Sequence, residues 1–178
     1  MKLLYQSDGV MLFEVFRAVD DRGSFTKIYQ MSEACGAYGI QFQIREVYYS
    51  VSNKDVIRGM HFQVPPHEHD KFVHVISGAA EDIVVDLRKN GPNYGKCHCF
   101  KLSSEASQFL YIPKGFAHGF KALTDNTCMI YMVSSEYHKA SDSGIHYRSI
   151  RHDWKTKNPI VSERDQAFQG IDEFQSPF

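Results

Sequence analysis

Histidines gather in one short stretch of the chain, and imidazole can act either as a metal ligand or as a proton acceptor near neutral pH. Residues 58–78 read RGMHFQVPPHEHDKFVHVISG, and His118 lies further along the chain. His61 is followed by the closely spaced pair His67 and His69. Two kinds of chemistry are therefore open: a metal centre built from several imidazoles, or acid–base catalysis by one of them.

The spacing of these histidines resembles the two half-motifs of cupin barrels, His-x-His and then Pro-x-Gly-x-x-His at residues 113–118. In metal-binding cupins the first half-motif continues with a glutamate, six further residues and a glycine, and counting back from Gly78 places Lys71 at the glutamate position. An ammonium group offers three donors and no acceptor, so it would repel a divalent cation. We therefore expect the barrel without a bound metal, with His67 and His69 as exposed loop residues.

A series of short strands must hold these side chains in place. Apolar or alternating segments are separated by turn residues at intervals of about 8–12 residues, which is typical of an antiparallel sandwich or barrel. The expected strands cover residues 72–77, 83–87, 96–102, 109–112, 120–123 and 129–133. His74 falls inside one of them, where a core or cross-strand role is expected. The fold prediction is all-β, a cupin-type antiparallel jelly-roll barrel with a few short peripheral helices.

The chain has 178 residues and 43% hydrophobic content, which suits one well-packed domain over residues 1–178. We expect N-terminal strands and an arm over 1–55, a barrel core over 56–135, and a C-terminal segment over 136–178 that wraps the barrel. A short helix is predicted over 31–38, with Ser32 as its N-cap and Gly36 near its end.

Composition excludes several partners. The net charge is −1 with no basic stripe, which argues against nucleic acid, and no polybasic segment or apolar run of about 20 residues indicates a membrane. The first residues do not read as a signal peptide, and there is no Gly-x-Gly-x-x-Gly motif for a dinucleotide. The cysteines lack paired Cys-x-x-Cys spacing, so we expect free thiols in a reducing cytoplasm. They are Cys35, Cys97, Cys99 and Cys128.

Several short segments, in register along nearly the whole chain, make the sequence similar to the dTDP-4-dehydrorhamnose 3,5-epimerase family. The matching segments are Asp21-Arg22-Gly23-x-Phe25, RGMHFQ at 58–63, Asp70-Lys71, VISG at 75–78, VVDLRKNGPNYGK at 84–96, LSSE at 102–105, YIPKGFAHGF at 111–120, Tyr131, Tyr137 and Ser162-Glu163-Arg164-Asp165. The resemblance implies an isomerase that inverts C3 and C5 of a nucleotide-linked 4-keto-6-deoxyhexose, in dTDP-rhamnose and polysaccharide biosynthesis. It implies no cofactor and no metal.

Such an inversion needs a base on one face of the sugar, a stabiliser at the C4 oxygen and an acid on the opposite face. By resemblance, His61 is the base and Asp165 is its orienting partner. Lys71 matches the positive charge beside the enolate oxygen. Tyr131 matches the acid that returns the proton from the other face.

The resemblance also assigns residues to substrate binding. They are Arg22, Phe25, Glu46, Arg58, Gln63, His118 and Tyr137. Arg22 and Arg58 match arginines that hold the diphosphate and sugar, because guanidinium offers a fixed fork of donors. Tyr137 matches an aromatic ring that stacks on the base. Strict strand alternation puts Arg58 and His61 on opposite faces, so Arg58 needs either a bend at Gly59 or a position at the strand mouth.

The sequence departs from the family pattern around the substrate. Lys27 stands where rhamnose-forming members commonly carry a glutamate, Glu46-Val47-Tyr48 replaces a Gln-x-Asn pair, and Met132 replaces a lysine. A CDP- or GDP-linked substrate, or inversion at one carbon only, therefore stays open. So do a metal-dependent cupin enzyme using His67, His69 and His118, and a non-catalytic module that binds sugar nucleotides. The family resemblance further implies a homodimer built by exchange of N-terminal strands.

Overall fold

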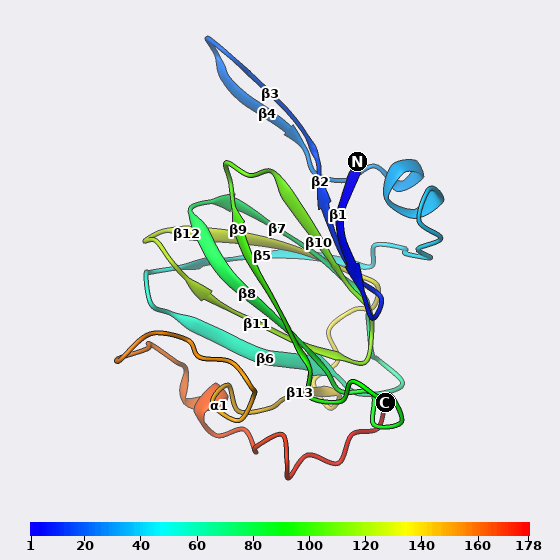
Figure 1. Cartoon of the computed structure of the whole chain (residues 1–178), viewed down its shortest axis with the longest axis vertical. Coiled ribbons are helices and arrows are strands. Elements are labelled where there is room, and N and C mark those ends of the chain that lie inside the picture. Colours follow the sequence, from blue (N-terminus) through cyan, green and yellow to red (C-terminus); the bar gives the residue numbers. More distant parts are fainter.

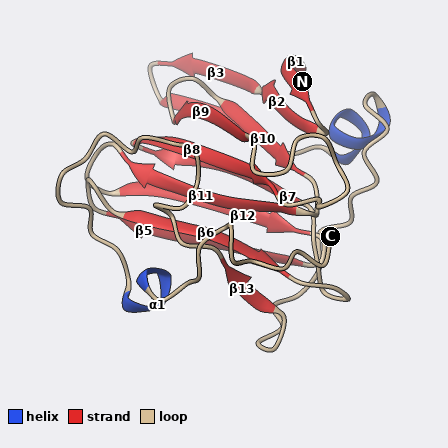
Figure 2. Ribbon diagram, turned by 60° about the horizontal axis from the view of Figure 1, so that its bottom comes forward, coloured by secondary structure: helices blue, strands red, loops and turns tan.

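Two antiparallel sheets face each other and enclose the core of the protein (Figures 1 and 2). The computed structural model describes residues 1–33 and 35–178. The six-stranded sheet consists, in spatial order, of β1 (Lys2–Ser7), β2 (Val10–Glu14), β10 (Gln108–Ile112), β7 (Lys71–Ser77), β12 (Thr127–Val133) and β5 (Glu46–Ser52). The five-stranded sheet consists of β13 (Asp142–Gly144), β6 (Ile57–Gln63), β11 (Phe116–Ala122), β8 (Ala79–Asp86) and β9 (Cys97–Ser103).

The remaining elements lie outside the two sheets. β3 (Phe16–Asp20) and β4 (Gly23–Lys27) pair into a hairpin that projects away from the body of the molecule (Figure 1). η1 (Ser32–Gly36) is a single π-helical turn, and α1 (Glu163–Gln166) is a short helix in the C-terminal segment. Among the described residues, no helix is long and apolar enough to cross a membrane.

Three apolar clusters follow from the alternation of side chains along the strands. The inner cluster fills the space between the sheets and includes Val73, Val84, Leu110 and Phe120. A second cluster covers the outer face of the five-stranded sheet, where Ile83 and Met60 pack under Ile145, Trp154 and Ile171 of the C-terminal segment. A third covers part of the outer face of the six-stranded sheet; it includes Phe13, Phe72, Phe109, Ile40 and Phe42.

The all-β jelly-roll prediction is confirmed, and each of the six expected strand segments lies in or overlaps a strand. β11 begins at Phe116, earlier than expected. All of its residues are buried, so its sequence lacks the alternation of apolar and polar residues that would mark the start of a half-exposed strand. The predicted N-cap is wrong: Met31 precedes η1 without a side-chain cap, and the hydroxyl of Ser32 instead accepts a hydrogen bond from Gln30. The division at residues 55 and 135 stays a prediction, and β1, β2 and β5 share one sheet with the later strands.

A bulge in β6 breaks the strict alternation around the RGMHFQ segment. His61 pairs with His118 and Arg58 pairs with Phe120, so two residues of β6 lie opposite the single residue Gly119. Gly59 has a φ of 135°, a backbone conformation that residues other than glycine rarely adopt. The chain therefore bends at Gly59, which was one of the two ways in which Arg58 could share a face with His61. Arg58 and His61 consequently line the same cavity.

Glycine at position 119 is needed because a side chain there has no space. A Cβ on Gly119 would lie 2.6 Å from Met60 Sδ and 2.7 Å from the carbonyl oxygen of Arg58. We expect Gly119→Ala to lower the free energy of unfolding by about 1–3 kcal/mol through overpacking, measured by urea denaturation. Gly36→Ala is the control because its Cβ would meet nothing within 4 Å. Equal stability of the two variants would contradict this role of Gly119.

Candidate active site

Two adjoining cavities open between the sheets and share the side chains of Tyr48, His61 and Lys71. The outer cavity has a volume of about 310 Å³ and the inner one about 200 Å³. The outer cavity is lined by Glu46, Tyr48, His61, Phe62, Gln63, His69, Lys71, Val133, Tyr137, Asp142 and Arg164. The inner one is lined by Tyr48, Ser50, Arg58, His61, Lys71, His118, Gly119, Phe120 and Tyr131. We call the two together the cleft.

His61 is held by a buried carboxylate behind it. Its Nε2 lies 2.8 Å from Asp165 Oδ1, while Asp165 Oδ2 accepts the backbone N–H of Gly59 at 3.1 Å. Burial by itself raises the pKa of Asp165, but the hydrogen bonds from His61, Gly59 and Ser162 lower it overall. An ionised Asp165 accepts a hydrogen bond from Nε2–H, so Nδ1 is the ring nitrogen left to take a proton.

The C-terminal segment brings Asp165 to this position. α1 begins after Ser162, whose hydroxyl accepts the backbone N–H of Asp165 at 3.1 Å as a helix N-cap. Just upstream, the carbonyl of Ile160 accepts the N–H of Ile57 at the start of β6. The ring of Phe168 packs edge-on against His61, with ring centres 5.9 Å apart. His61 and Asp165 are therefore held together although they lie more than a hundred positions apart in the chain.

Lys71 brings a buried positive charge into the cleft. It begins β7 in the six-stranded sheet, and its Nζ donates to the backbone carbonyl of His61 at 3.2 Å. The side chain is buried, and this desolvation lowers the pKa of Lys71 to about 8, although Asp142 and Asp82 oppose the shift. At neutral pH the ammonium is present, and at alkaline pH it is lost.

Tyr131 faces the cleft from β12 and is almost completely buried. Its ring stacks on Tyr48, with centres 4.7 Å apart, and its hydroxyl lies 3.4 Å from Ser50 Oγ. Burial raises the pKa of Tyr131 well above its ordinary value, so the phenol stays protonated through the neutral range. Because β12 and β6 belong to opposite sheets, Tyr131 and His61 enter the cleft from opposite sides.

His118 is the second imidazole of the inner cavity. Its Nε2 lies 2.8 Å from Asp82 Oδ2, and both side chains are buried between β11 and β8. Asp82 comes from the inward face of β8, and its Oδ1 has no hydrogen-bond partner among the described residues. The pair fixes the orientation of His118, as Asp165 fixes that of His61.

Two predicted binding residues hold the rim of the cleft rather than offering free groups. The amide nitrogen of Gln63 donates to the carbonyls of His67 and Glu136, and its amide oxygen accepts the N–H of His138 at 2.6 Å. Glu46 Oε2 accepts the backbone N–H of Tyr137 at 2.6 Å. The Tyr137 ring itself is 61% exposed and stands at the mouth of the cleft.

Arg58 reaches the cleft beside the bulge. Its Nε donates to Ser52 Oγ at 2.9 Å, and one Nη donates to the carbonyl of Val51 at 3.1 Å. This leaves part of the guanidinium fork free at the inner cavity. The arginine is thus oriented by the edge strand β5, and it has no carboxylate partner within the part of the chain that the structure describes.

The cleft contains residues that sequence reasoning missed. Tyr48 could have been found from alternation, since Glu46, Tyr48 and Ser50 share one face of β5. Asp142 and Arg164 form an ion pair of 2.7 Å at the rim, and no local pattern in the sequence signals it. Asp142 begins β13 and Arg164 lies in α1, two elements that only the fold brings together.

Arg22 and Phe25 do not meet the other predicted site residues within one chain. Both lie on the projecting β3–β4 hairpin, and Arg22 is paired with Asp20 at its tip. Phe25 is 60% exposed and packs edge-on against Phe16. Their positions therefore do not support a role for either residue in binding substrate in the cleft of the same chain.

The structure does not gather the histidines of the metal-dependent alternative. The ring of His67 stacks on His138, Nδ1 of His69 lies 3.1 Å from Ser135 Oγ, and His118 is paired with Asp82. Among the described residues, these three histidines do not form a cluster of metal-ligand spacing. The expectation of exposed loop histidines is also wrong: both are half-buried, and burial lowers the pKa of His69 to about 3. His74 is buried with Nδ1 against the Gln108 carbonyl, as expected of a cross-strand residue.

Comparison with known proteins places this geometry among enzymes. The family model described as dTDP-4-dehydrorhamnose 3,5-epimerase matches residues 5–173. A dTDP-4-dehydrorhamnose 3,5-epimerase of Shigella flexneri is 35% identical, covering 93% of this chain and 94% of its own length. A dTDP-4-dehydrorhamnose 3-epimerase of Streptomyces niveus is 33% identical, covering 89% and 78% respectively.

A solved structure shows the same arrangement of strands with a sugar nucleotide bound. It is the dTDP-6-deoxy-D-glucose-3,5-epimerase of Legionella pneumophila in complex with dTDP-4-keto-L-rhamnose. It aligns with a TM-score of 0.93 and 30% identity, covering 98% of this chain and 94% of the other.

The buried carboxylate of Asp165 makes a prediction about the tautomer of His61. In Asp165→Asn, the amide oxygen can still accept the Gly59 N–H, but the amide nitrogen would then donate to His61 Nε2. The proton of neutral His61 should therefore move to Nδ1, and the wild-type base nitrogen would be blocked. Long-range ¹⁵N–¹H NMR distinguishes the tautomers. An Asp165→Asn protein in which His61 keeps the Nε2–H form would contradict the assignment.

Proposed function

The chain belongs to the dTDP-4-dehydrorhamnose 3,5-epimerase family, and we propose that its cleft inverts C3 and C5 of a dTDP-linked 4-keto-6-deoxyhexose. The protein is an isomerase that acts on sugar nucleotides. The observation that carries the proposal is the placement of His61 and Tyr131 on opposite sides of a cleft that Lys71 also lines. A reaction made only of proton transfers needs no cofactor.

The first step is removal of a proton next to the C4 ketone. Nδ1 of His61 takes the proton, and the electrons of the broken C–H bond form a double bond to C4 while the carbonyl π electrons move onto the C4 oxygen, which gives an enolate. Asp165 stabilises the imidazolium that forms, because its carboxylate already lies 2.8 Å from Nε2. The ammonium of Lys71 stabilises the negative charge that develops on the C4 oxygen.

Inversion requires the proton to return from the other face. The Tyr131 hydroxyl delivers it to the same carbon, and the resulting phenolate takes a proton from solvent as His61 releases its own. The raised pKa of Tyr131 keeps the phenol protonated until the enolate forms. Two such cycles, one at C3 and one at C5, complete the reaction.

The substrate is bound by groups around the mouth of the cleft. Arg58 offers its free guanidinium donors to the sugar or diphosphate, and Tyr137 offers an exposed ring for stacking on the base. The carboxylates of Glu46 and Asp142 also line the outer cavity. A CDP- or GDP-linked sugar stays an alternative, since Glu46-Val47-Tyr48 alters the family pattern here.

A 3-epimerase that inverts a single carbon is the second candidate function. The observation that favours it is the Streptomyces niveus relative, whose name specifies a 3-epimerase. The catalytic set is the same for both reactions, so only the number of carbons that exchange separates them.

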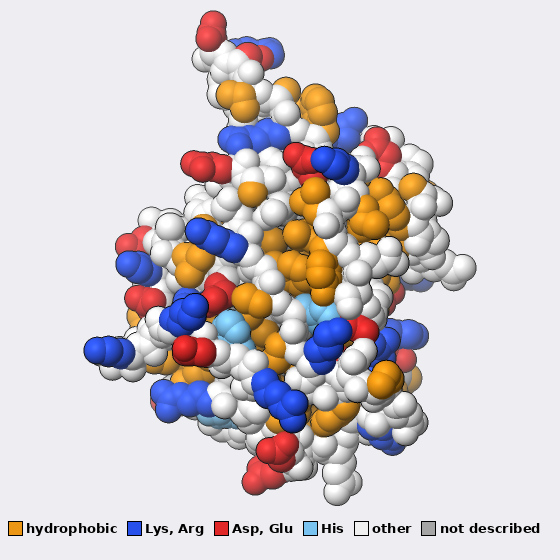
Figure 3. All heavy atoms as spheres, in the orientation of Figure 1, with side chains coloured by type: hydrophobic (Ala, Val, Ile, Leu, Met, Phe, Trp, Pro, Cys, Tyr) orange, Lys and Arg blue, Asp and Glu red, His pale blue; other side chains and the backbone are white. Residues whose placement is uncertain are grey.

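We further propose that the protein works as a homodimer in the cytoplasm. The β3–β4 hairpin carries exposed apolar side chains, with Phe16 at 60%, Val19 at 69% and Phe25 at 60% (Figure 3). The edge strand β5 adds the exposed side chains of Val47, Tyr49 and Val51. Exposed apolar patches are typical of interaction surfaces, and a second copy would give the hairpin's Arg22 and Phe25 a route to a partner's cleft. The cytoplasmic location rests on the four free cysteines.

The reaction is tested by hydrogen exchange with a dTDP-linked 4-keto-6-deoxyglucose in deuterated water. We expect deuterium at C3 and C5, and a loss of exchange by about 10²–10⁴-fold in His61→Asn. Tyr131→Phe should retain exchange on the His61 face but yield little inverted product, whereas Tyr147→Phe, outside the cleft, should match the wild type. Deuterium at C3 alone would select the 3-epimerase. Absence of exchange with dTDP-, CDP- and GDP-linked 4-keto sugars would refute the epimerase.

The lowered pKa of Lys71 leads us to expect that the reaction rate depends on pH. The ammonium is the active form and its pKa is lowered to about 8 by burial, so kcat/KM should fall as the pH rises through about 8. Lys71→Arg should move this decline to higher pH, because guanidinium keeps its charge. Lys71→Met should be slow at every pH. A wild-type profile that stays flat to pH 10 would argue against a role for this charge.

The dimer predicts the mass in solution. Light scattering should give twice the chain mass of 20.5 kDa. Val19→Asp combined with Phe25→Asp, both on the projecting hairpin, should shift the protein towards the monomer. A wild-type protein that stays at the monomer mass at millimolar concentration would contradict the dimer.

A further inference from the structure

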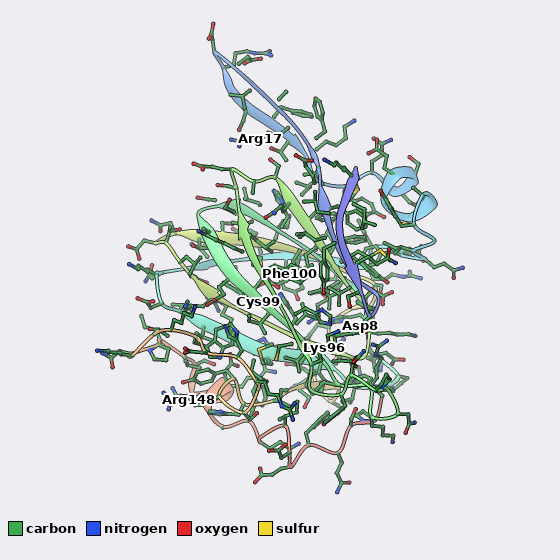
Figure 4. The ribbon with its side chains drawn as sticks, in the orientation of Figure 1. Asp8, Arg17, Lys96, Cys99, Phe100 and Arg148 are labelled. Carbon is green, nitrogen blue, oxygen red and sulfur yellow. The ribbon has the colours of Figure 1, made fainter. Side chains whose placement is uncertain are left out.

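A cluster of metal-binding side chains lies on the outer face of the five-stranded sheet, away from the cleft. It consists of Glu81 on β8, Cys99 on β9 and His152 in the C-terminal segment. One ligand atom from each lies within 4.8 Å of the others. Cys99 is marked on β9 in Figure 4. Glu81 shares the outward face of β8 with Ile83, which packs in the outer cluster, whereas Asp82 points inward to His118.

The sheet register explains how the first two groups meet. Glu81 pairs with Lys101 of β9, and Ile83 pairs with Cys99, so Glu81 and Cys99 are diagonal neighbours on one face. The C-terminal segment covers this face, and it is anchored there by Trp154, which is buried in the same outer cluster. His152 is thereby held over the two strands, with its ring edge-on to Trp154 at 4.9 Å between centres.

One of the converging atoms, a ring nitrogen of His152, makes no hydrogen bond within the described part of the chain. Nε2 of His152 is buried and has no hydrogen-bond partner among the described residues. It lies 3.7 Å from Glu81 Oε1. A buried ring nitrogen without a partner is uncommon, because buried polar atoms are normally hydrogen-bonded. The geometry therefore leaves an imidazole nitrogen, a carboxylate oxygen and a sulfur facing one small volume.

Lys121 lies behind this cluster and accounts for the other carboxylate oxygen. Its Nζ is 2.9 Å from Glu81 Oε2 and also donates to the backbone carbonyl of Trp154. The ammonium thus fixes the orientation of Glu81 and leaves Oε1 directed at His152. Ligating carboxylates are commonly held by such a second partner.

We propose that Glu81, Cys99 and His152 bind one divalent ion of the zinc class. Thiolate, imidazole and carboxylate are the ligands that Zn²⁺ prefers, and three protein ligands leave one position of a tetrahedral site for water. Cys99 is exposed, which gives the ion a route in and leaves room for that water. The ion would join β8 and β9 to the C-terminal segment, the same segment that supplies Asp165 to the cleft.

Trp154 provides a built-in reporter, because it is the only tryptophan in the chain and lies against His152. We would titrate metal-free protein with Co²⁺, which replaces Zn²⁺ and has a near-ultraviolet charge-transfer band when bound by a thiolate. We expect one equivalent to produce that band and to quench Trp154 emission, and an equivalent of Zn²⁺ to reverse both. Zn²⁺ should also raise the Tm of the wild type.

Matched variants separate this site from other binding. Cys99→Ser should abolish the band, and both it and His152→Gln should weaken binding at least 10-fold and remove the Tm rise. Cys128→Ser, on β12 of the other sheet, and His146→Gln should behave as the wild type. Because Cys99 is exposed, its replacement by serine should leave the fold intact, which circular dichroism checks. Absence of the thiolate band, or an equal effect of Cys128→Ser and Cys99→Ser, would overturn the proposal.

Discussion

The active site depends on one buried carboxylate, that of Asp165. One of its oxygens holds His61 Nε2 and the other holds the backbone N–H of Gly59, so the same group orients the base and fixes the bulge in β6. The bulge in turn lets Arg58 and His61 enter one cavity from a strand whose alternation would separate them. Since Asp165 comes from the C-terminal segment, the barrel alone is not a complete site.

Burial sets the charges that the chemistry needs, and it acts in opposite directions on two groups. It lowers the pKa of Lys71 and raises that of Tyr131, which in each case favours the neutral form. For Tyr131 this keeps the phenol protonated, which is the form that the proposed acid needs. For Lys71 it weakens a charge that the enolate requires, and the carboxylates of Asp142 and Asp82 offset part of the loss. The charge of Lys71 therefore depends on two opposing effects, desolvation by burial and attraction to nearby carboxylates.

Sequence reasoning reached the fold, and it named candidate catalytic residues that the structure brings together, because these have local or family-wide signals. Short strands closed by turns predicted the jelly roll, and Lys71 at the glutamate position argued against a cupin metal. It failed where tertiary contact decides the outcome. His67 and His69 look like loop residues after two prolines, yet His138, Ser135 and Gln63 half-bury them. The ion pair of Asp142 with Arg164 joins β13 to α1, and no spacing rule connects these two elements. Arg22 lies on a hairpin that projects away from the body of the molecule, and the motif around it does not reveal that placement.

The central claim is that the sugar ring lies between a base and an acid on opposite faces. A crystal structure of the His61→Asn variant with a dTDP-linked 4-keto-6-deoxyhexose tests it directly. We expect C3 or C5 to lie between residue 61 and the Tyr131 hydroxyl, with Lys71 Nζ within hydrogen-bond distance of the C4 oxygen. A ring with residue 61 and Tyr131 on the same face, or a C4 oxygen remote from Lys71, would contradict it.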